Sequence, residues 1–269
     1  MVAQAALRAE PGLNTDPLLS VRNVSVRFGG IVALDGVSFD VAPGEIAGLI
    51  GPNGAGKTTL FNCLSRLYIP NEGDILFEGS SILSEPPHAI PQLGICRTFQ
   101  NVALFDRMSV LDNVKVGCHN KTATGFITNA LRLPHWQGEE SRITERAHEL
   151  IAFMDLAAYT YAPALGLPFP VRKRVELARA LAGSPKLLLL DEPAAGLNHD
   201  EVDVLRGQIR RIRDAQDVTV LLVEHHMSLV MSVSDKVVAI DFGKKLAEGT
   251  PAQVQKNPDV IRAYLGTEG

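Results

Sequence analysis

The sequence predicts an α/β protein built on a mostly parallel sheet with helices packed against it. Two observations lead to this prediction: strand-like apolar runs alternate with segments of helical periodicity, and a glycine-rich turn directly follows one of the runs. The apolar runs lie at 46–50, 187–190, 218–223 and 236–241. The 269-residue chain is 46% hydrophobic, which suits one large domain or two small ones and excludes a disordered chain.

The first part of the chain has a different pattern. Residues 18–28 and 31–41 alternate apolar and polar side chains, so we expect two half-buried strands with Gly29 and Gly30 in the turn between them. Residues 1–16 lack the apolar core of a secretory signal and are expected to form a flexible leader.

Helical periodicity is expected at 57–67, over most of 108–182 and at 200–214. Within the long middle stretch, residues 119–137 are less regular. A further short strand is expected at 94–99. The tail from residue 251 is expected to form a turn followed by a short helix over 258–265.

Composition excludes several classes of function. There are 26 Lys and Arg against 30 Asp and Glu, so the chain lacks the basic excess typical of a nucleic-acid binder. The three cysteines, Cys63, Cys96 and Cys118, show no CxxC spacing, and their odd number argues against a disulfide framework. No run approaches the roughly 20 apolar residues that cross a bilayer, so we expect any membrane role to depend on a partner.

Residues 51–58, GPNGAGKT, match the phosphate-loop pattern G-x-x-x-x-G-K-[ST] between an apolar strand and a helix. Glycines at these positions let successive backbone N–H groups cradle phosphate oxygens at a helix N-terminus. We expect Lys57 to reach the β- and γ-phosphates and the Thr58 hydroxyl to ligate Mg²⁺. The expected nucleotide-binding residues of this loop are Gly51, Pro52, Asn53, Gly54, Ala55, Gly56, Lys57, Thr58 and Thr59.

A second motif consists of four leucines, 187–190, followed by Asp191 and Glu192. Ligands of open α/β sheets bind at the carboxyl ends of the strands, where these two carboxylates are expected to lie. We expect Asp191 to hold Mg²⁺, directly or through water, and Glu192 to polarise the attacking water. The structural alternative is a buried strand whose terminal acids cap the next helix.

Together the two motifs resemble the ATP-binding subunits of ABC transporters. The resemblance implies a P-loop NTPase (RecA-like) core with a mostly parallel sheet, an N-terminal antiparallel β subdomain and an inserted α-helical subdomain. It also implies ATP and Mg²⁺ as cofactors. By this resemblance, residues 17–253 form the ATP-binding domain, with the helical subdomain inserted at about 101–182, and residues 254–269 form a family-specific tail.

Three further residues match positions of that family. Gln100 resembles the Q-loop glutamine, which contacts Mg²⁺ and the lytic water and couples the ATP site to the membrane subunit. His225, directly after Glu224, resembles the switch histidine that contacts the γ-phosphate, although the adjacent His226 leaves the register open. Phe28 resembles the aromatic residue on which adenine stacks, and an ordinary strand residue is the alternative. The implied catalytic set is Glu192, His225, Gln100 and Lys57.

Four longer segments of the sequence resemble one particular group within the ABC transporter family. RTFQNVALF at 97–105, EPAAGLN at 192–198, LLVEHHM at 221–227 and the tail at 248–266 resemble the longer ATP-binding subunit of branched-chain amino acid uptake transporters. This implies a peripheral subunit at the cytoplasmic face of the bacterial inner membrane. Its implied partners are two membrane permease subunits and, indirectly, a periplasmic solute-binding protein, with no nucleic acid.

The sequence does not identify the transported solute, because relatives of this group transport urea, amides or aromatic acids. Two alternatives to an amino-acid importer are an export ATPase of the lipopolysaccharide type and a regulatory ATP-binding module with low turnover.

The chain departs from the family at the signature L-S-G-G-Q, which completes the ATP site of the opposite subunit. Counting back from ELARAL at 176–181 places residues 167–171, LPFPV, over the signature. Pro168 replaces its serine and Pro170 replaces a glycine, and proline supplies neither a hydroxyl nor an N–H. This favours a heterodimer with a second ABC ATPase subunit that carries an intact signature. The alternative is that the helix dipole and the remaining amides suffice.

Overall fold

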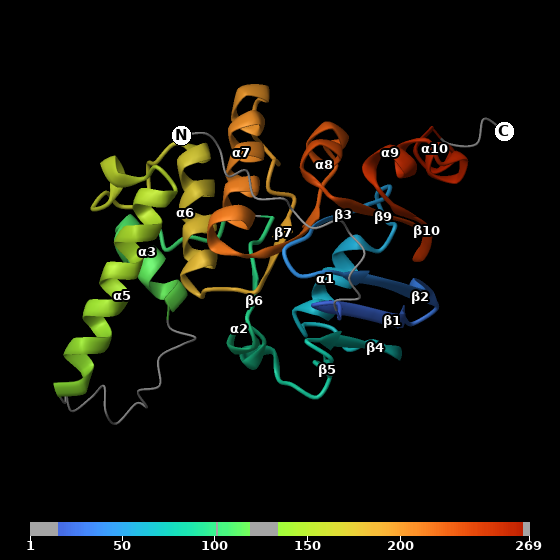
Figure 1. Cartoon of the computed structure of the whole chain (residues 1–269), viewed down its shortest axis with the longest axis horizontal. Coiled ribbons are helices and arrows are strands. Elements are labelled where there is room, and N and C mark those ends of the chain that lie inside the picture. The colour runs from blue at the N-terminus through green and yellow to red at the C-terminus, as the bar shows by residue number, and fades with distance from the viewer. Residues whose placement is uncertain (1–15, 101, 119–133, 266–269) are drawn as a thin grey trace, which may run out of the picture.

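The computed structural model describes residues 16–100, 102–118 and 134–265. Its central feature is a six-stranded sheet in the order β10-β9-β3-β8-β7-β6 (Figure 1). The five strands from β9 to β6 pair in parallel, and β10 pairs antiparallel to β9 at one edge. The expected mostly parallel sheet is therefore confirmed. Its strands are β3 (Ile46–Ile50), β6 (Ile95–Arg97), β7 (Leu187–Asp191), β8 (Thr219–Val223), β9 (Lys236–Asp241) and β10 (Lys244–Gly249).

A second sheet is four-stranded and antiparallel, in the order β2-β1-β4-β5. The strands expected at 18–28 and 31–41 are confirmed as β1 (Leu19–Phe28) and β2 (Ile31–Val41). The remaining strands are β4 (Glu72–Phe77) and β5 (Ser80–Ser81). This is the N-terminal antiparallel sheet that the family resemblance implied.

The parallel sheet is covered on both faces, because alternate residues of its strands enter two different cores. Ile46 and Ile50 of β3 belong to the core that the helices build, whereas Ala47 and Leu49 belong to the core beneath the antiparallel sheet. Every residue of β3, β7 and β8 is buried, which is why these strands are continuous apolar runs in the sequence. Helix α1 (Lys57–Leu64) lies in the second core through Leu60 and Phe61.

Helices α3 (Val110–Val116), α5 (Pro134–Phe153) and α6 (Phe169–Ala182) pack against one another beside the sheet (Figure 1). They form the implied helical insertion. Helices α7 (His199–Gln216) and α8 (Met227–Val233) contribute to the same core. The shorter helices are α2 (Ile90–Leu93), α9 (Pro251–Gln255), α10 (Pro258–Leu265) and 3₁₀ turns at Pro87–Ala89 and Ala157–Tyr159. Within the described residues, no helix is long and apolar enough to span a membrane.

Several expected boundaries were wrong. The helix expected at 57–67 ends at Leu64, since Arg66 adopts a positive φ of 57°. The turn expected after residue 251 is helix α9, because Thr250 and Gln253 form a reciprocal capping box at its start. Of the segment expected to be irregular, residues 119–133 lie outside the described residues, and residues 134–137 already belong to α5.

Candidate active site

The glycine-rich loop connects β3 to α1, and its backbone lies tightly against neighbouring strands. A Cβ at Gly51 would lie 2.2 Å from the Ile240 carbonyl oxygen, and one at Gly56 would lie 2.5 Å from the Ala33 oxygen. Gly54 and Gly56 have positive φ values of 83° and 103°, which favour glycine. Helix α1 then starts without a side-chain cap and without an acidic residue in its first turn, so its N–H groups are available to an anion.

Lys57 lies inside this loop. Its Nζ donates hydrogen bonds to the carbonyl oxygens of Gly51 (2.7 Å) and Pro52 (2.9 Å), and the residue is 5% exposed. Burial lowers the pKa of Lys57 below its ordinary value of 10.5, while the nearby Glu192 carboxylate acts in the opposite direction. The loop therefore holds a desolvated cation against its own backbone.

A cavity of about 260 Å³ opens beside the loop. It brings residues 53–59 of the loop together with Glu192 and His225, two residues that the sequence placed in the site. Apolar residues at the start of β2 also line it. The full lining is Ile31, Val32, Ala33, Asn53, Gly54, Ala55, Gly56, Lys57, Thr58, Thr59, Glu192 and His225.

Glu192, which follows β7, contacts side chains from two other segments of the chain, at Gln100 and at His225. It follows β7 with a positive φ of 47°, and its Oε1 lies 2.8 Å from Nε2 of His225. The Nε2 of Gln100 donates a hydrogen bond to the other carboxylate oxygen of Glu192 at 2.7 Å. Both carboxylate oxygens are thus held at the cavity wall, in the arrangement that a general base with two orienting partners requires.

Glu224 was missed by the sequence analysis as a functional residue. Its carboxylate is 1% exposed and accepts hydrogen bonds from the backbone N–H of Ala194 (2.5 Å) and of His225 (2.9 Å). The Glu224 carboxylate therefore links the backbone that follows β8, at His225, to the backbone that follows Glu192, at Ala194. The two adjacent histidines have different partners, because Nε2 of His225 contacts Glu192 whereas Nδ1 of His226 contacts Glu224.

Asp191 does not line the cavity. Its Oδ2 forms an ion pair with Arg97 at 2.6 Å, and the Arg97 guanidinium also lies 5.2 Å from the Phe99 ring centroid. The same guanidinium donates to Asn62 at 2.9 Å. In the sequence Arg97 stands out only within the segment 97–105 that resembles the family, because the contact that gives it a role joins residues 94 positions apart.

Phe28 also lies outside the lining residues. It ends β1 directly opposite Ile31, which does line the cavity. The Phe28 side chain is 45% exposed and meets Tyr68 edge to face with a centroid distance of 5.2 Å. Its ring is accessible, and it stands one strand away from the phosphate loop.

Residues 167–171 span the N-terminal boundary of α6, which begins at Phe169. Pro168 caps the helix without a side-chain hydrogen bond, and the backbone N–H groups of Val171 and Arg172 both donate to its carbonyl oxygen, at 2.9 and 3.0 Å. Pro170 has no N–H, so Phe169 holds the one N–H of this first turn that is not used inside the helix. The Phe169 ring packs toward Gly196, where an added Cβ would lie 2.9 Å from Cε1 of that ring.

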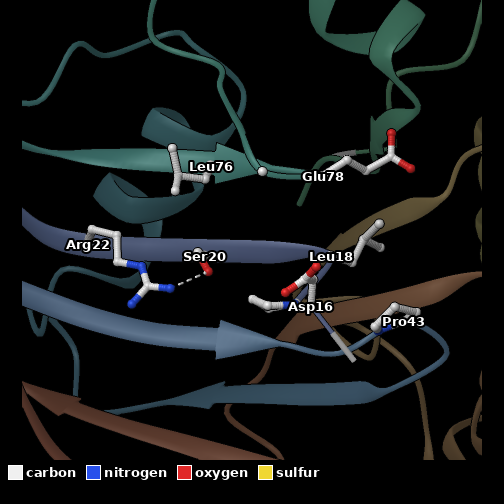
Figure 2. Close-up of a pocket in the computed structure, with 9 residues that line it drawn as sticks. Asp16, Leu18, Ser20, Arg22, Pro43, Leu76 and Glu78 are labelled. Atoms are coloured by element: carbon white, nitrogen blue, oxygen red, sulfur yellow. Dashed lines mark hydrogen bonds between the residues drawn. The ribbon is translucent and has the colours of Figure 1, made fainter. Parts of the chain in front are cut away.

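A larger cavity, of about 460 Å³, is lined by residues of β1 and β4 and shares no lining residue with the phosphate-loop cavity (Figure 2). Two of its polar lining residues pair with each other, since Arg22 donates to Ser20 at 3.0 Å, and Arg22 also lies 3.4 Å from Asp40. Glu78 pairs with Lys186 at 2.7 Å. The lining of this cavity consists of Asp16, Pro17, Leu18, Ser20, Arg22, Pro43, Leu76, Glu78 and Gly79.

The phosphate loop on a parallel sheet, with Glu192 held between Gln100 and His225, defines a P-loop ATPase. Comparison with known proteins gives the particular group. Residues 34–195 match the ABC transporter family, and residues 244–269 match the family described as branched-chain amino acid ATP-binding cassette transporter. The chain belongs to the ABC transporter family as an ATP-hydrolysing transport subunit, which confirms the resemblance found in the motifs.

Two relatives illustrate the match. The high-affinity branched-chain amino acid transport ATP-binding protein BraF of Pseudomonas aeruginosa is 43% identical over 93% of this chain and 98% of its own length. LivG of Escherichia coli, a protein of the same description, is 42% identical over 94% of this chain and 99% of its own.

Solved structures agree with the fold. The ADP conformation of MJ1267, an ATP-binding cassette of an ABC transporter, superposes with a TM-score of 0.81 at 31% identity, covering 94% of this chain and 100% of that one. A nucleotide-free cassette from an ABC transporter gives a TM-score of 0.80 at 31% identity, covering 93% of this chain and 99% of that one.

Proposed function

We propose that this chain is the ATP-hydrolysing subunit of an importer for branched-chain amino acids, or for a related small solute such as urea, an amide or an aromatic acid. The names of BraF and LivG support the solute class, as does the family matched by residues 244–269. The observation that carries the motor role is the Glu192 carboxylate, held by Gln100 and His225 at the rim of the phosphate-loop cavity.

The proposed chemistry is hydrolysis of ATP, in which a water oxygen bonds to the γ-phosphorus while the bond between the β- and γ-phosphates breaks and ADP leaves. Positioning and charge stabilisation supply most of the catalysis. Lys57 and the loop N–H groups hold the phosphates. Glu192 accepts a proton from the attacking water, while Gln100 orients that water and His225 contacts the γ-phosphate. Each of these side chains lines the cavity or directly contacts one that does.

Magnesium fits the oxygen groups at this site. Mg²⁺ keeps several waters and takes one or two protein oxygens together with phosphate oxygens, so it needs no complete protein cage. Consistent with this, the described residues contain no group of three His, Cys, Asp or Glu side chains that would hold a metal alone. We assign Thr58 and Gln100 as its protein contacts. Asp191 lies outside the cavity and pairs with Arg97, so we assign it a contact through water. When bound, the ion neutralises charge that develops on the phosphate oxygens.

Phe28 is proposed as the adenine platform. Support comes from its half-exposed ring and from its pairing with Ile31, whose side chain reaches the cavity wall. An aromatic ring at this position offers a face on which a planar base stacks.

The partner proposed for this chain is a second ABC ATPase subunit with an intact signature. The start of α6 supports this proposal, since Pro168 and Pro170 lack donors and the Val171 and Arg172 amides are already bonded to Pro168. Loss of one preorganised donor to developing charge costs about 2.7–4 kcal/mol. Two permease subunits and a periplasmic solute-binding protein complete the proposed assembly, at the cytoplasmic face of the bacterial inner membrane.

A regulatory ATP-binding module with low turnover is the second candidate, because the same α6 start weakens the site offered to the partner. Deletion of this chain in its own organism separates the two. We expect uptake of labelled leucine to fall and to be restored by the wild-type chain but not by Glu192→Gln, which keeps the ATP-binding residues and lacks the proposed base. Normal leucine uptake with impaired uptake of urea or an aromatic acid would reassign the solute. Full rescue by Glu192→Gln would contradict the motor role.

A further inference from the structure

Three side chains on one face of α6 bond to the main chain that carries Gln100. Nζ of Lys173 donates to the Gln100 carbonyl oxygen at 3.4 Å, and Oε1 of Glu176 accepts from the Phe99 N–H at 3.2 Å. One turn further on, Arg179 donates to the Ala103 carbonyl oxygen at 2.6 Å. A spacing of three residues places Lys173, Glu176 and Arg179 along one side of the helix.

Two of these three side chains are buried, whereas Arg179 is partly exposed. Lys173 is 6% exposed and Glu176 is 3% exposed. Burial raises the pKa of Glu176 above its ordinary value of 4.5, although the Phe99 N–H and the cations Lys173 and Arg179 act against this shift. Burying charged side chains is unfavourable unless they form hydrogen bonds. Here their hydrogen-bond partners are backbone atoms of Phe99, Gln100 and Ala103.

That segment contacts a residue that lines the catalytic cavity. Gln100 donates to Oε2 of Glu192 at 2.7 Å, and the Phe99 ring lies over the Arg97 guanidinium that pairs with Asp191. The contacts therefore form a continuous connection from α6, through the backbone around Gln100, to both acidic residues at the end of β7.

The other end of α6 is the signature segment. Pro168 caps this helix, and residues 173 and 176 lie in its next two turns. A helix is stiff over so short a distance, so a displacement at its start is transmitted to the side chains that hold the Gln100 backbone.

We infer that Lys173 and Glu176 are positioning residues, which fix the backbone around Gln100 so that its amide orients Glu192. The position of α6, and hence contact of the signature segment with the partner subunit, sets the orientation of Glu192 in this chain's own site. The inference rests on the proposed catalytic roles of Glu192 and Gln100. Through these contacts, a displacement of the signature segment changes the position of Gln100 in this chain's own site, even though that segment has few hydrogen-bond donors.

Paired substitutions at residue 176 separate positioning from bulk stability. Glu176→Gln keeps a side-chain oxygen that accepts from Phe99, whereas Glu176→Leu has a similar size and no acceptor. Lys173→Met removes the donor to Gln100 and keeps the aliphatic stem. Arg174→Met is the matched control on the same helix, because Arg174 donates to the Asp155 carbonyl oxygen at 3.1 Å, away from the Gln100 segment.

The first measurement is amide hydrogen exchange of the full-length chain without nucleotide. In Glu176→Leu we expect the Phe99 amide to exchange about tenfold faster or more, since its acceptor is gone. Glu176→Gln and Arg174→Met should exchange as the wild type does. Unchanged Phe99 exchange in Glu176→Leu would overturn the inference. This readout does not depend on ATP hydrolysis, so it stays informative if the proposed catalytic roles fail.

The second measurement is ATP turnover of the transporter purified with its own subunits. We expect kcat to fall about tenfold in Glu176→Leu and Lys173→Met with KM for ATP nearly unchanged, because the phosphate loop is untouched. Glu176→Gln should restore kcat. An equal loss in Glu176→Gln and Glu176→Leu would overturn the inference, as would a rise in KM without loss of kcat. If Glu176→Leu does not fold, Lys173→Met carries the same comparison.

Discussion

Arg97 and Asp191 form an ion pair of 2.6 Å in which the side chains are only 8% and 7% exposed. The pair joins β6 to the carboxyl end of β7, beside the residues proposed to perform hydrolysis. The Arg97 side chain also lies 5.6 Å from the Phe61 ring centroid in α1. A single buried cation thus connects α1, the helix after the phosphate loop, with the acidic end of β7.

Replacing Arg97 with leucine should therefore be strongly destabilising, because it leaves the Asp191 charge buried and unpaired. We expect a loss of about 3–5 kcal/mol in the free energy of unfolding, measured by urea denaturation. Asp191→Asn in the same chain should recover much of this loss, since the amide carries no charge. Equal stability of the single and double variants would show that the ion pair is not the cause.

Gly51→Ala should disturb the phosphate loop, since the new Cβ would meet the Ile240 carbonyl oxygen at 2.2 Å. We expect the free energy of unfolding to fall by about 1–3 kcal/mol. We also expect ATP to bind more weakly, and calorimetry measures both effects. Gly207→Ala in α7 is the control, because a Cβ there meets nothing within 4 Å. It should stabilise the chain by about 0.5–1 kcal/mol. Normal ATP affinity in Gly51→Ala would contradict the expected close packing of this loop.

ATP binding should depend on pH through Lys57, whose pKa is lowered by burial. As pH rises toward this lowered pKa, below 10.5, the ammonium loses its proton and affinity for ATP should fall. In the same window the unfolded chain holds the proton more readily, so stability of the nucleotide-free chain should rise with pH. Titration calorimetry and urea denaturation between pH 7 and 10 measure the two effects. Lys57→Met should remove both trends, and their persistence would assign them to another group.

Glu192→Gln should retain ATP binding and lose turnover, because the amide does not accept a proton from water. A general base contributes about 10²–10⁴ in rate, so kcat of the assembled transporter should fall by that factor. Glu149→Gln, an exposed position on α5 that pairs with Arg146, is the control and should leave kcat unchanged. Turnover near the wild-type value in Glu192→Gln would remove Glu192 from the role of base.

The central strands were predictable from the sequence because they are buried on both faces. The run at 236–241 coincides with β9, and the phosphate loop lies between a strand and a helix as expected. Strand β10 was not anticipated. It is an edge strand of partly exposed residues, KKLAEG, and its sequence carries neither an apolar run nor a regular alternation.

The site residues were predictable where they belong to one local sequence motif, as Lys57 and Thr58 do. Contacts between residues far apart in the sequence were not predictable. Glu224 bonds to Ala194, thirty residues earlier in the sequence, and no local pattern distinguishes it from an ordinary acid at a strand end. The contacts of Glu176 with Phe99 likewise span 77 residues. Such partners depend on the packing of α6 against the sheet, which the sequence alone does not specify.

The claim that this chain needs a partner with an intact signature is tested most directly by one measurement. That measurement is Mg²⁺-dependent ATP hydrolysis by the purified full-length chain, alone, compared with Pro168→Ser/Pro170→Gly. We expect a nearly silent wild type and an active double variant, because the substitutions restore a hydroxyl and an N–H at the start of α6. Brisk hydrolysis by the wild type alone would contradict the account and make a homodimer sufficient.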